Sequence, residues 1–184
     1  EAIDPNGRPI LNPNMSPSPR GTLTYPGEMG ATNWWPPAYS PSAHLFYVLT
    51  LDSGSLFFRN EEPFRKGEMF NRGTSQPAPG ESHRFAIQAV VPETGQLKWE
   101  YRLSPRQPKR SHYMGGLLST AGGLIFGSDG AWFLALDAHT GEELWRFNAG
   151  GDIAAAPITY MVDRRQYVAV AAGRAILTFS LDRE

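Results

Sequence analysis

The sequence MGGLLSTAGGLIFGSDGAWFLALDAHTGEELWRFN, residues 114–148, contains four short apolar runs separated by turn-forming residues. Glycine, serine, aspartate and threonine recur between the runs, and the 3.6-residue apolar periodicity of a helix is absent. This pattern is typical of antiparallel strands joined by hairpins. We therefore predict a four-stranded β-meander with strands over 117–120, 124–127, 131–137 and 143–147. One such meander cannot bury both of its faces, so we expect neighbouring sheets of the same kind.

A second copy of the end of this meander lies earlier in the chain. Residues 135–145 follow the pattern A-x-D-x-x-T-G-x-x-x-W, and residues 89–99 repeat it with Val91 in place of the aspartate. The spacing of the two copies is the length of a four-stranded blade in a β-propeller. A single Thr-Gly hairpin followed by tryptophan can arise by chance, whereas two copies in register indicate a repeat.

The repeat predicts an all-β fold, a partial β-propeller of about three blades, each an antiparallel four-stranded sheet. We expect the first blade over 33–104 with a loop insertion at 59–83, the second over 111–149 and the third over 150–184. The third blade is expected to be incomplete because only three apolar runs remain for it. Six prolines interrupt residues 1–32, so an irregular N-terminal segment is expected there. We interpret the whole chain, residues 1–184, as the C-terminal arc of a larger ring.

The composition of the 184 residues fits this fold and excludes several classes of function. Hydrophobic residues make up 41% of the chain, and its 19 glycines and 16 prolines suit a β-protein rich in turns. The net charge of -1 argues against a nucleic-acid partner. Cysteine is absent, which excludes disulfides and thiolate metal ligands. No apolar run approaches the roughly 18 residues that a membrane-spanning helix needs, so we expect no membrane span in this sequence.

Four stretches together resemble the C-terminal part of dehydrogenases that depend on pyrroloquinoline quinone (PQQ). These quinoprotein alcohol and sugar dehydrogenases, glucose dehydrogenase among them, are eight-bladed propellers. The stretches are GATNWWPPAYSP at 30–41, GGLLSTAGGLIFG at 115–127, the repeat at 135–145, and PITYMVDRRQYVAVAAG at 157–173. The repeat is similar to the tryptophan-docking motif of that family, so the resemblance implies that Trp99 and Trp145 tie one blade to the next. An indole suits this role, because it is large, apolar and carries a single N–H donor.

The resemblance also implies a cofactor site. It places PQQ on the propeller axis with Ca²⁺ or a lanthanide, and it implies that Asn33 and Trp34 bind the cofactor. An amide can hydrogen-bond a quinone oxygen or a carboxylate. The alternative is that Asn33 caps a turn before two prolines, beside a Trp34 that only packs. Alcohol-oxidising members carry tryptophan where this chain has Met114, so both an alcohol and a sugar are retained as substrate classes.

In the family, the catalytic base and the metal ligands belong to blades that precede the stretch equivalent to 30–34. We therefore expect no catalytic and no metal-binding residue in this chain, and no dehydrogenase activity or bound cofactor for the fragment alone. The parent protein is expected to be a periplasmic oxidoreductase, although no signal peptide is recognised in the sequence. Its expected partners are the remaining blades and a small alcohol or sugar. Exposed sheet faces favour self-association of the fragment.

A different class of function is a PQQ-like propeller that has lost its cofactor and serves as a protein-binding scaffold. Metal ligands encoded upstream would support the enzyme, and their absence would support the scaffold. Other candidate residues carry less information. The histidines are scattered and are expected to be surface or turn residues; they are His44, His83, His112 and His139. The basic cluster of Arg106, Lys109 and Arg110 is interpreted as a solvated connector.

Overall fold

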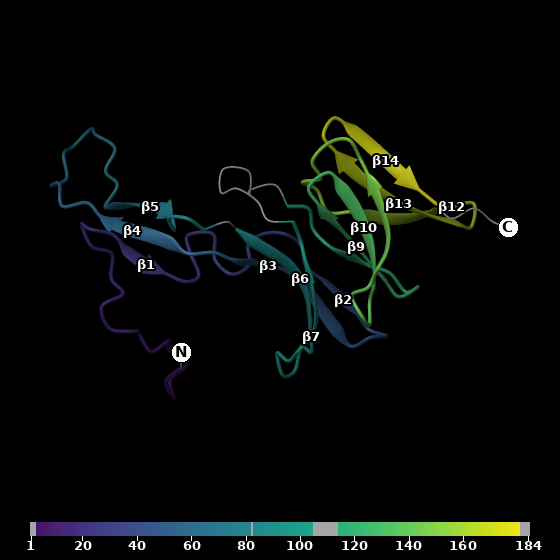
Figure 1. Ribbon diagram of the computed structural model, residues 1–184, viewed down its shortest axis with the longest axis horizontal. Helices are drawn as coiled ribbons and strands as arrows, with labels where there is room; N and C mark the ends of the chain where they lie inside the picture. Colours follow the sequence, from purple (N-terminus) through teal and green to yellow (C-terminus); the bar gives the residue numbers. More distant parts are fainter. Residues whose placement is uncertain (1–2, 82, 105–113, 181–184) are drawn as a thin grey trace. The chain divides into compact units, whose positions relative to one another are not determined.

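The computed structural model describes residues 3–81, 83–104 and 114–180 (Figure 1). All regular secondary structure within these residues is β-strand, and neighbouring strands in each sheet run antiparallel. The chain divides into two compact units. The first comprises Glu1–Ala31 and Asp52–Glu81, and the second comprises Thr32–Leu51 and Ser82–Glu184. The all-β prediction is therefore confirmed.

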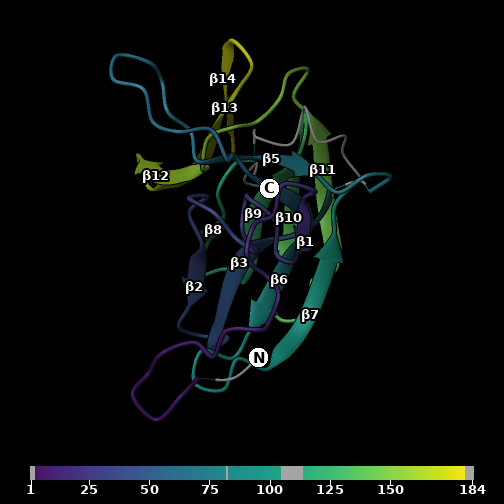
Figure 2. The ribbon, with the colours of Figure 1, turned by 90° about the vertical axis from the view of Figure 1, so that its left-hand side faces the viewer.

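The first sheet of the second unit contains four strands. They are β2 (Ala38–Ser40), β3 (Leu45–Asp52), β6 (Arg84–Val90) and β7 (Leu97–Arg102), and Figure 2 shows them side by side in this order. Strand β3 has the alternation expected of a strand with one buried face, because Leu45, Tyr47, Leu49 and Leu51 are buried and the residues between them are not. Residues 53–83 separate its second and third strands, and this segment includes the predicted insertion at 59–83.

The second sheet is the predicted meander. It contains β8 (Leu118–Ser119), β9 (Leu124–Asp129), β10 (Trp132–Asp137) and β11 (Glu143–Asn148), paired in chain order. The third sheet has three strands, β12 (Ile158–Val162), β13 (Arg165–Ala172) and β14 (Ala175–Phe179). Figure 1 shows the second and third sheets side by side, and a shared apolar core lies between them. Its buried members are Phe133, Ile153, Val168, Val170 and Ala172.

The first unit differs from the sequence-based prediction. Residues 1–32, expected to be irregular, contain the short strand β1 (Thr22–Thr24), and the predicted loop at 59–83 contains β5 (Gly73–Pro77). Both pair with β4 (Ser55–Arg59) to form a three-stranded sheet in the order β1-β4-β5. The sequence GTSQP of β5 has low intrinsic strand propensity. Pairing with β4 makes it a strand, and that contact between separate segments has no signature in local sequence.

The repeated motif forms the same turn in the first and second sheets. In the second sheet, Gly141 N–H donates to the Asp137 carbonyl and Gly141 has a φ of 74°. In the first sheet, Gly95 N–H donates to the Val91 carbonyl and Gly95 has a φ of 69°. Glycine adopts this left-handed conformation at no steric cost.

A carboxylate adds further bonds to the second of these turns. Asp137 Oδ1 accepts hydrogen bonds from the N–H groups of His139 and Thr140 at 2.9 and 2.8 Å. The backbone N–H of Thr140 contributes most to holding the pKa of the Asp137 carboxyl below its usual value. Val91 has no such group, and the turn in the first sheet forms without it.

One carbonyl oxygen joins the first sheet to the second. Ala138 O accepts a hydrogen bond from Trp99 Nε1 at 3.0 Å and another from the Tyr47 hydroxyl at 2.9 Å. The Trp99 indole lies against Gly141, where an added Cβ would come within 2.6 Å of the ring. Trp99 is 8% exposed. Its buried N–H donor is therefore satisfied by the turn that the repeated motif forms.

The outer strands of these two sheets are linked by a polar cluster of Tyr101 on β7 and Glu143 and Arg146 on β11. Glu143 accepts hydrogen bonds from the Tyr101 hydroxyl and from the Arg146 guanidinium. The hydrogen bonds from Arg146 are the main cause that lowers the pKa of Glu143 below its ordinary 4.5. Burial, followed by the neighbouring Glu143 carboxylate, raises the pKa of Tyr101 to about 12.

Replacing Gly141 with alanine should weaken the contact between the first two sheets. Gly141→Ala and the matched control Gly95→Ala both place alanine in the left-handed region, which costs about 1–2 kcal/mol. An added Cβ meets Trp99 only at Gly141, since nothing lies within 4 Å of the Cβ position of Gly95. We expect Gly141→Ala to lose a further 1–3 kcal/mol or so through overpacking. Urea unfolding followed by tryptophan fluorescence measures both, and equal losses would contradict this assignment.

The cluster around Glu143 should make stability depend on pH. Because its pKa is lower in the folded than in the unfolded chain, Glu143 contributes stability above about pH 4.5 that is lost as the pH falls through the folded value. Glu143→Gln should therefore lower the free energy of unfolding at pH 7, and the difference from wild type should shrink below pH 4.5. The matched control is Glu142→Gln on the neighbouring residue. A difference that stays constant from pH 7 to low pH would rule out this role for Glu143.

Candidate functional site

The loops that precede β2, β8 and β12 come together at one place. The Leu117 N–H donates to the Pro36 carbonyl at 2.9 Å. A Cβ added to Gly116 would lie 2.8 Å from both Pro36 Cδ and Ala156 Cβ. Residues from each loop are thus in close contact, and the glycine allows their backbones to approach. Each loop leads into the first strand of its sheet, so this is a point where three sheets present equivalent segments.

The two candidate cofactor residues lie in the first of these loops. Asn33 is exposed, and its Oδ1 accepts a hydrogen bond from the Trp34 N–H at 2.8 Å. Trp34 is 66% exposed, whereas its neighbour Trp35 is 1% exposed and packs edge-on against Phe85 with 5.8 Å between ring centroids. Trp35 therefore anchors the loop and Trp34 presents its indole to the exterior. Asn33 therefore lies at the surface of the loop beside the exposed Trp34.

Met114 lies in the second loop, and it is buried with 1% exposure. Its side chain therefore contributes to packing beneath the site. The neighbouring Gly115 is equally confined, since an added Cβ would lie 2.9 Å from the Ala155 carbonyl oxygen. Larger residues at 115 or 116 would push the loops apart.

The described residues bring no metal site together. Within 3–81, 83–104 and 114–180, no three His, Asp or Glu side chains converge as a bound ion would require. His44 and His139 lie in turns as expected. His83, expected at the surface, is instead buried and packs against the Phe85 ring at 6.3 Å. His112 and the basic cluster Arg106, Lys109 and Arg110 lie outside the described residues. The described chain also contains no helix long and apolar enough to cross a membrane.

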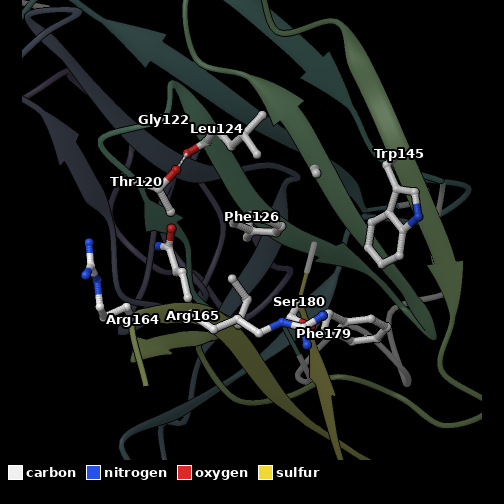
Figure 3. Close-up of a pocket in the computed structure, with 12 residues that line it drawn as sticks. Thr120, Gly122, Leu124, Phe126, Trp145, Arg164, Arg165, Phe179 and Ser180 are labelled. Atoms are coloured by element: carbon white, nitrogen blue, oxygen red, sulfur yellow. Dashed lines mark hydrogen bonds between the residues drawn. The ribbon is translucent and has the colours of Figure 1, made fainter. Parts of the chain in front are cut away.

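A cavity of about 610 Å³ lies between the second and third sheets. It is near the C-terminal ends of β8 and β12, whereas the loops described above precede these strands. Figure 3 shows Phe126 in the wall between Trp145 on one side and Arg164 on the other. Apolar and aromatic side chains form most of the wall, and arginine, glutamine, threonine and serine complete it. The lining residues include Leu124, Phe126, Trp145, Val168, Phe179, Arg164 and Arg165.

Trp145 occupies the same position in its sheet as Trp99. Ala135 pairs with Trp145 and Ala89 pairs with Trp99, and the strand register shifts directly after each alanine. Trp145 also contacts the next sheet, because its ring lies 5.3 Å from that of Phe179. It is nevertheless 38% exposed. The difference arises because the third sheet presents Phe179 to this indole, where the second sheet presents the Gly141 turn to Trp99.

Comparison with known proteins shows which protein family this chain is similar to. A sequence model of the PQQ family, described as glucose/ethanol/alcohol dehydrogenase, beta-propeller domain, matches residues 89–168. Quinoprotein alcohol dehydrogenase PedE of Pseudomonas putida is 33% identical over 177 residues, which cover 91% of this chain and 27% of PedE. The chain is similar to the C-terminal part of PQQ-dependent quinoprotein alcohol dehydrogenases.

Solved structures of quinoprotein dehydrogenases have the same fold. Quinohemoprotein alcohol dehydrogenase from Comamonas testosteroni matches with a TM-score of 0.80 and 26% identity, over 95% of this chain and 27% of that one. A europium-containing methanol dehydrogenase matches with a TM-score of 0.73 and 29% identity, over 90% of this chain and 29% of that one. The chain thus spans little more than a quarter of these quinoprotein dehydrogenases. Its fold is a partial β-propeller, as predicted, and its four-stranded sheets are blades.

Two features of the structure have no signal in the local sequence. The cavity between the second and third sheets depends on how two separate hairpins pack, and no local pattern reports this. The Ala138 carbonyl is a backbone group, so its residue type gives no signal. The Thr-Gly turn that carries it was recognisable, and a search for the partner of Trp99 could have started there.

Replacing Gly116 with alanine should disturb the convergence of the three loops. The added Cβ would meet Pro36 and Ala156 at 2.8 Å, whereas the nearest atom to a Cβ at Gly122 lies at 4.0 Å. We expect Gly116→Ala to lower the free energy of unfolding by about 1–3 kcal/mol, with Gly122→Ala close to neutral as the matched control. Urea unfolding gives the stabilities, and backbone NMR shifts of Asn33 and Trp34 report the loop. Unchanged shifts and stability in Gly116→Ala would refute the close packing.

Proposed function

We propose that this chain is part of a PQQ-dependent dehydrogenase that oxidises an alcohol or a sugar, and that Asn33 and Trp34 contact the cofactor. The observation that supports this most directly is the position of these two residues. They are exposed on a loop that meets the equivalent loops of two further blades. Segments from successive blades meet in this way near a propeller axis, where the family holds its quinone.

The exposed groups of Asn33 and Trp34 fit a flat quinone that carries carboxylates. The Trp34 indole offers an open aromatic face for stacking. The Asn33 amide has two N–H donors and an acceptor oxygen, and its oxygen accepts a hydrogen bond from the Trp34 N–H. An amide can hydrogen-bond a quinone oxygen or a carboxylate. When bound, PQQ supplies the two-electron redox chemistry, and this chain would contribute to its position and orientation.

The metal and the proton acceptor must come from elsewhere in such an enzyme. The described residues bring no cluster of His, Asp or Glu together, so they do not fit Ca²⁺ or a lanthanide by themselves. We propose that other blades of the parent chain supply these ligands and the general base. The isolated chain would then retain neither PQQ nor metal and would have no dehydrogenase activity.

The remaining blades are the proposed partners. The contact of Trp99 with Ala138 and Gly141 supports tryptophan docking between consecutive blades. On the third sheet, Val168 and Val170 face the core with the second sheet, while Ile158 and Ile176 on the opposite face are exposed. An exposed apolar face of this kind favours coverage by another sheet. In the isolated fragment the same face favours self-association. The periplasmic location is proposed from the likeness to quinoprotein alcohol dehydrogenases.

The role of Asn33 can be tested in the longer parent protein. Asn33→Ala should weaken PQQ binding roughly tenfold, as expected for one lost hydrogen bond to a charged or strongly polar group. Asn148→Ala is the matched control, because Asn148 Oδ1 likewise accepts a local backbone hydrogen bond, from the Gly150 N–H at 2.9 Å. Titration with PQQ, followed by its absorbance, gives both affinities. If Asn33→Ala binds PQQ as the control does, the cofactor role of Asn33 is wrong.

The same titration distinguishes the two classes of function. A parent protein that binds no PQQ, and turns over no alcohol or sugar with PQQ and Ca²⁺ or a lanthanide present, would favour the protein-binding scaffold. Turnover by residues 1–184 alone would refute the proposed dependence on other blades.

A further inference from the structure

We propose that the cavity between the second and third sheets binds a small, flat aromatic carboxylate. The cavity lies apart from the loops assigned to the cofactor. Thr120 and Arg164, which line it, follow strands β8 and β12, whereas the cofactor loops precede these strands. The inference therefore does not rest on the proposed dehydrogenase function.

The aromatic wall favours a flat ligand. Phe126 belongs to the second sheet and Phe179 to the third, and Trp145 lies 5.3 Å from the Phe179 ring with 75° between the ring planes. Leu124 and Val168 complete the apolar part of the wall. Trp145 remains 38% exposed beside this cavity. A planar apolar body inserted here would remove aromatic surface from water and offer edge-on or stacked ring contacts.

Two arginines favour an anionic group on that ligand. Arg164 and Arg165 lie in and after the tight turn between β12 and β13, and both line the cavity. Asp163 and Arg164 have φ values of 48° and 62°, a left-handed conformation that costs energy in residues other than glycine. Both side chains line the cavity, and Figure 3 shows Arg164 on the side away from Trp145, whereas Arg165 extends toward Ser180 and Phe179. A guanidinium has five N–H donors in a planar fork, so it can bind a carboxylate in addition to an existing partner.

The size and distribution of polar groups are those of a small-molecule site. The volume of about 610 Å³ lies in the range of such sites, which are mostly apolar with a few placed polar groups. The Thr120 hydroxyl donates to the Leu124 carbonyl at 3.3 Å, and Gln166 Nε2 lies 2.9 Å from Thr159 Oγ1. These side chains are held by local contacts. Among the lining residues the two arginines carry the charge, so they are the groups that would select the charge of a ligand.

Binding of 2-naphthoate to the 184-residue chain tests the proposal, with 2-naphthamide as a neutral compound of the same shape. Isothermal titration calorimetry should show saturable binding of the carboxylate, weakened by increasing sodium chloride. Arg164→Gln/Arg165→Gln should weaken naphthoate binding at least tenfold and leave the weaker naphthamide binding unchanged. Arg174→Gln is the matched control, since Arg174 lies in the other hairpin turn of the same sheet. It should bind naphthoate as the wild type does.

If Arg164→Gln/Arg165→Gln does not fold, the sodium chloride series on the wild type and a second variant still test the proposal. Ser180→Phe places a ring at the cavity wall and should abolish binding of both compounds. The absence of saturable binding to the wild type at millimolar concentrations would overturn the proposal, as would equal loss in the arginine variants and the Arg174→Gln control. Binding unaffected by Ser180→Phe would place the ligand elsewhere and also overturn it. If a polypeptide segment occupies the cavity, the wild type will show no saturable binding, which overturns the proposal.

Discussion

The carbonyl oxygen of Ala138 accepts two hydrogen bonds from the neighbouring sheet, and the packing of the first two blades depends on this group. Trp99 and Tyr47 both bury large rings, and each must satisfy a polar hydrogen on burial. A carbonyl has two lone pairs, so a single backbone position serves both donors. The turn that presents it is fixed by Gly141 and by the Asp137 carboxylate. Register, turn geometry and contact between blades are therefore specified by one short motif.

The sequence was sufficient for most of the fold because the repeat is local. Each copy of the repeated motif and each turn of the second sheet lies within a short segment, and the strands predicted over 124–127, 131–137 and 143–147 correspond to β9, β10 and β11. The small sheet of the first unit could not be predicted in this way. Strand β5 is formed from GTSQP, which becomes a strand only by pairing with β4. Pairing between segments dominates weak intrinsic propensity in such a case.

The candidate site was only partly accessible to sequence reasoning. A resemblance makes Asn33 and Trp34 candidates for the cofactor site, and the structure adds that they are exposed on one of three loops that meet. The burial of His83 was missed, because a lone histidine has no periodic neighbours that report its environment. The cavity beside Trp145 was missed for a different reason. Its two walls come from separate sheets, so its existence depends on tertiary packing alone.

The adjacent tryptophans at positions 34 and 35 carry a constraint on how this protein can evolve. The two residues lie in a bend before β2, where one indole is buried against Phe85 while the other faces outward. Insertion of one residue between Trp35 and Pro36, or deletion of Trp35, would displace the buried indole from its position against Phe85. Loop length at this point is therefore expected to vary less among descendants of this sequence than the identity of the residues that flank it.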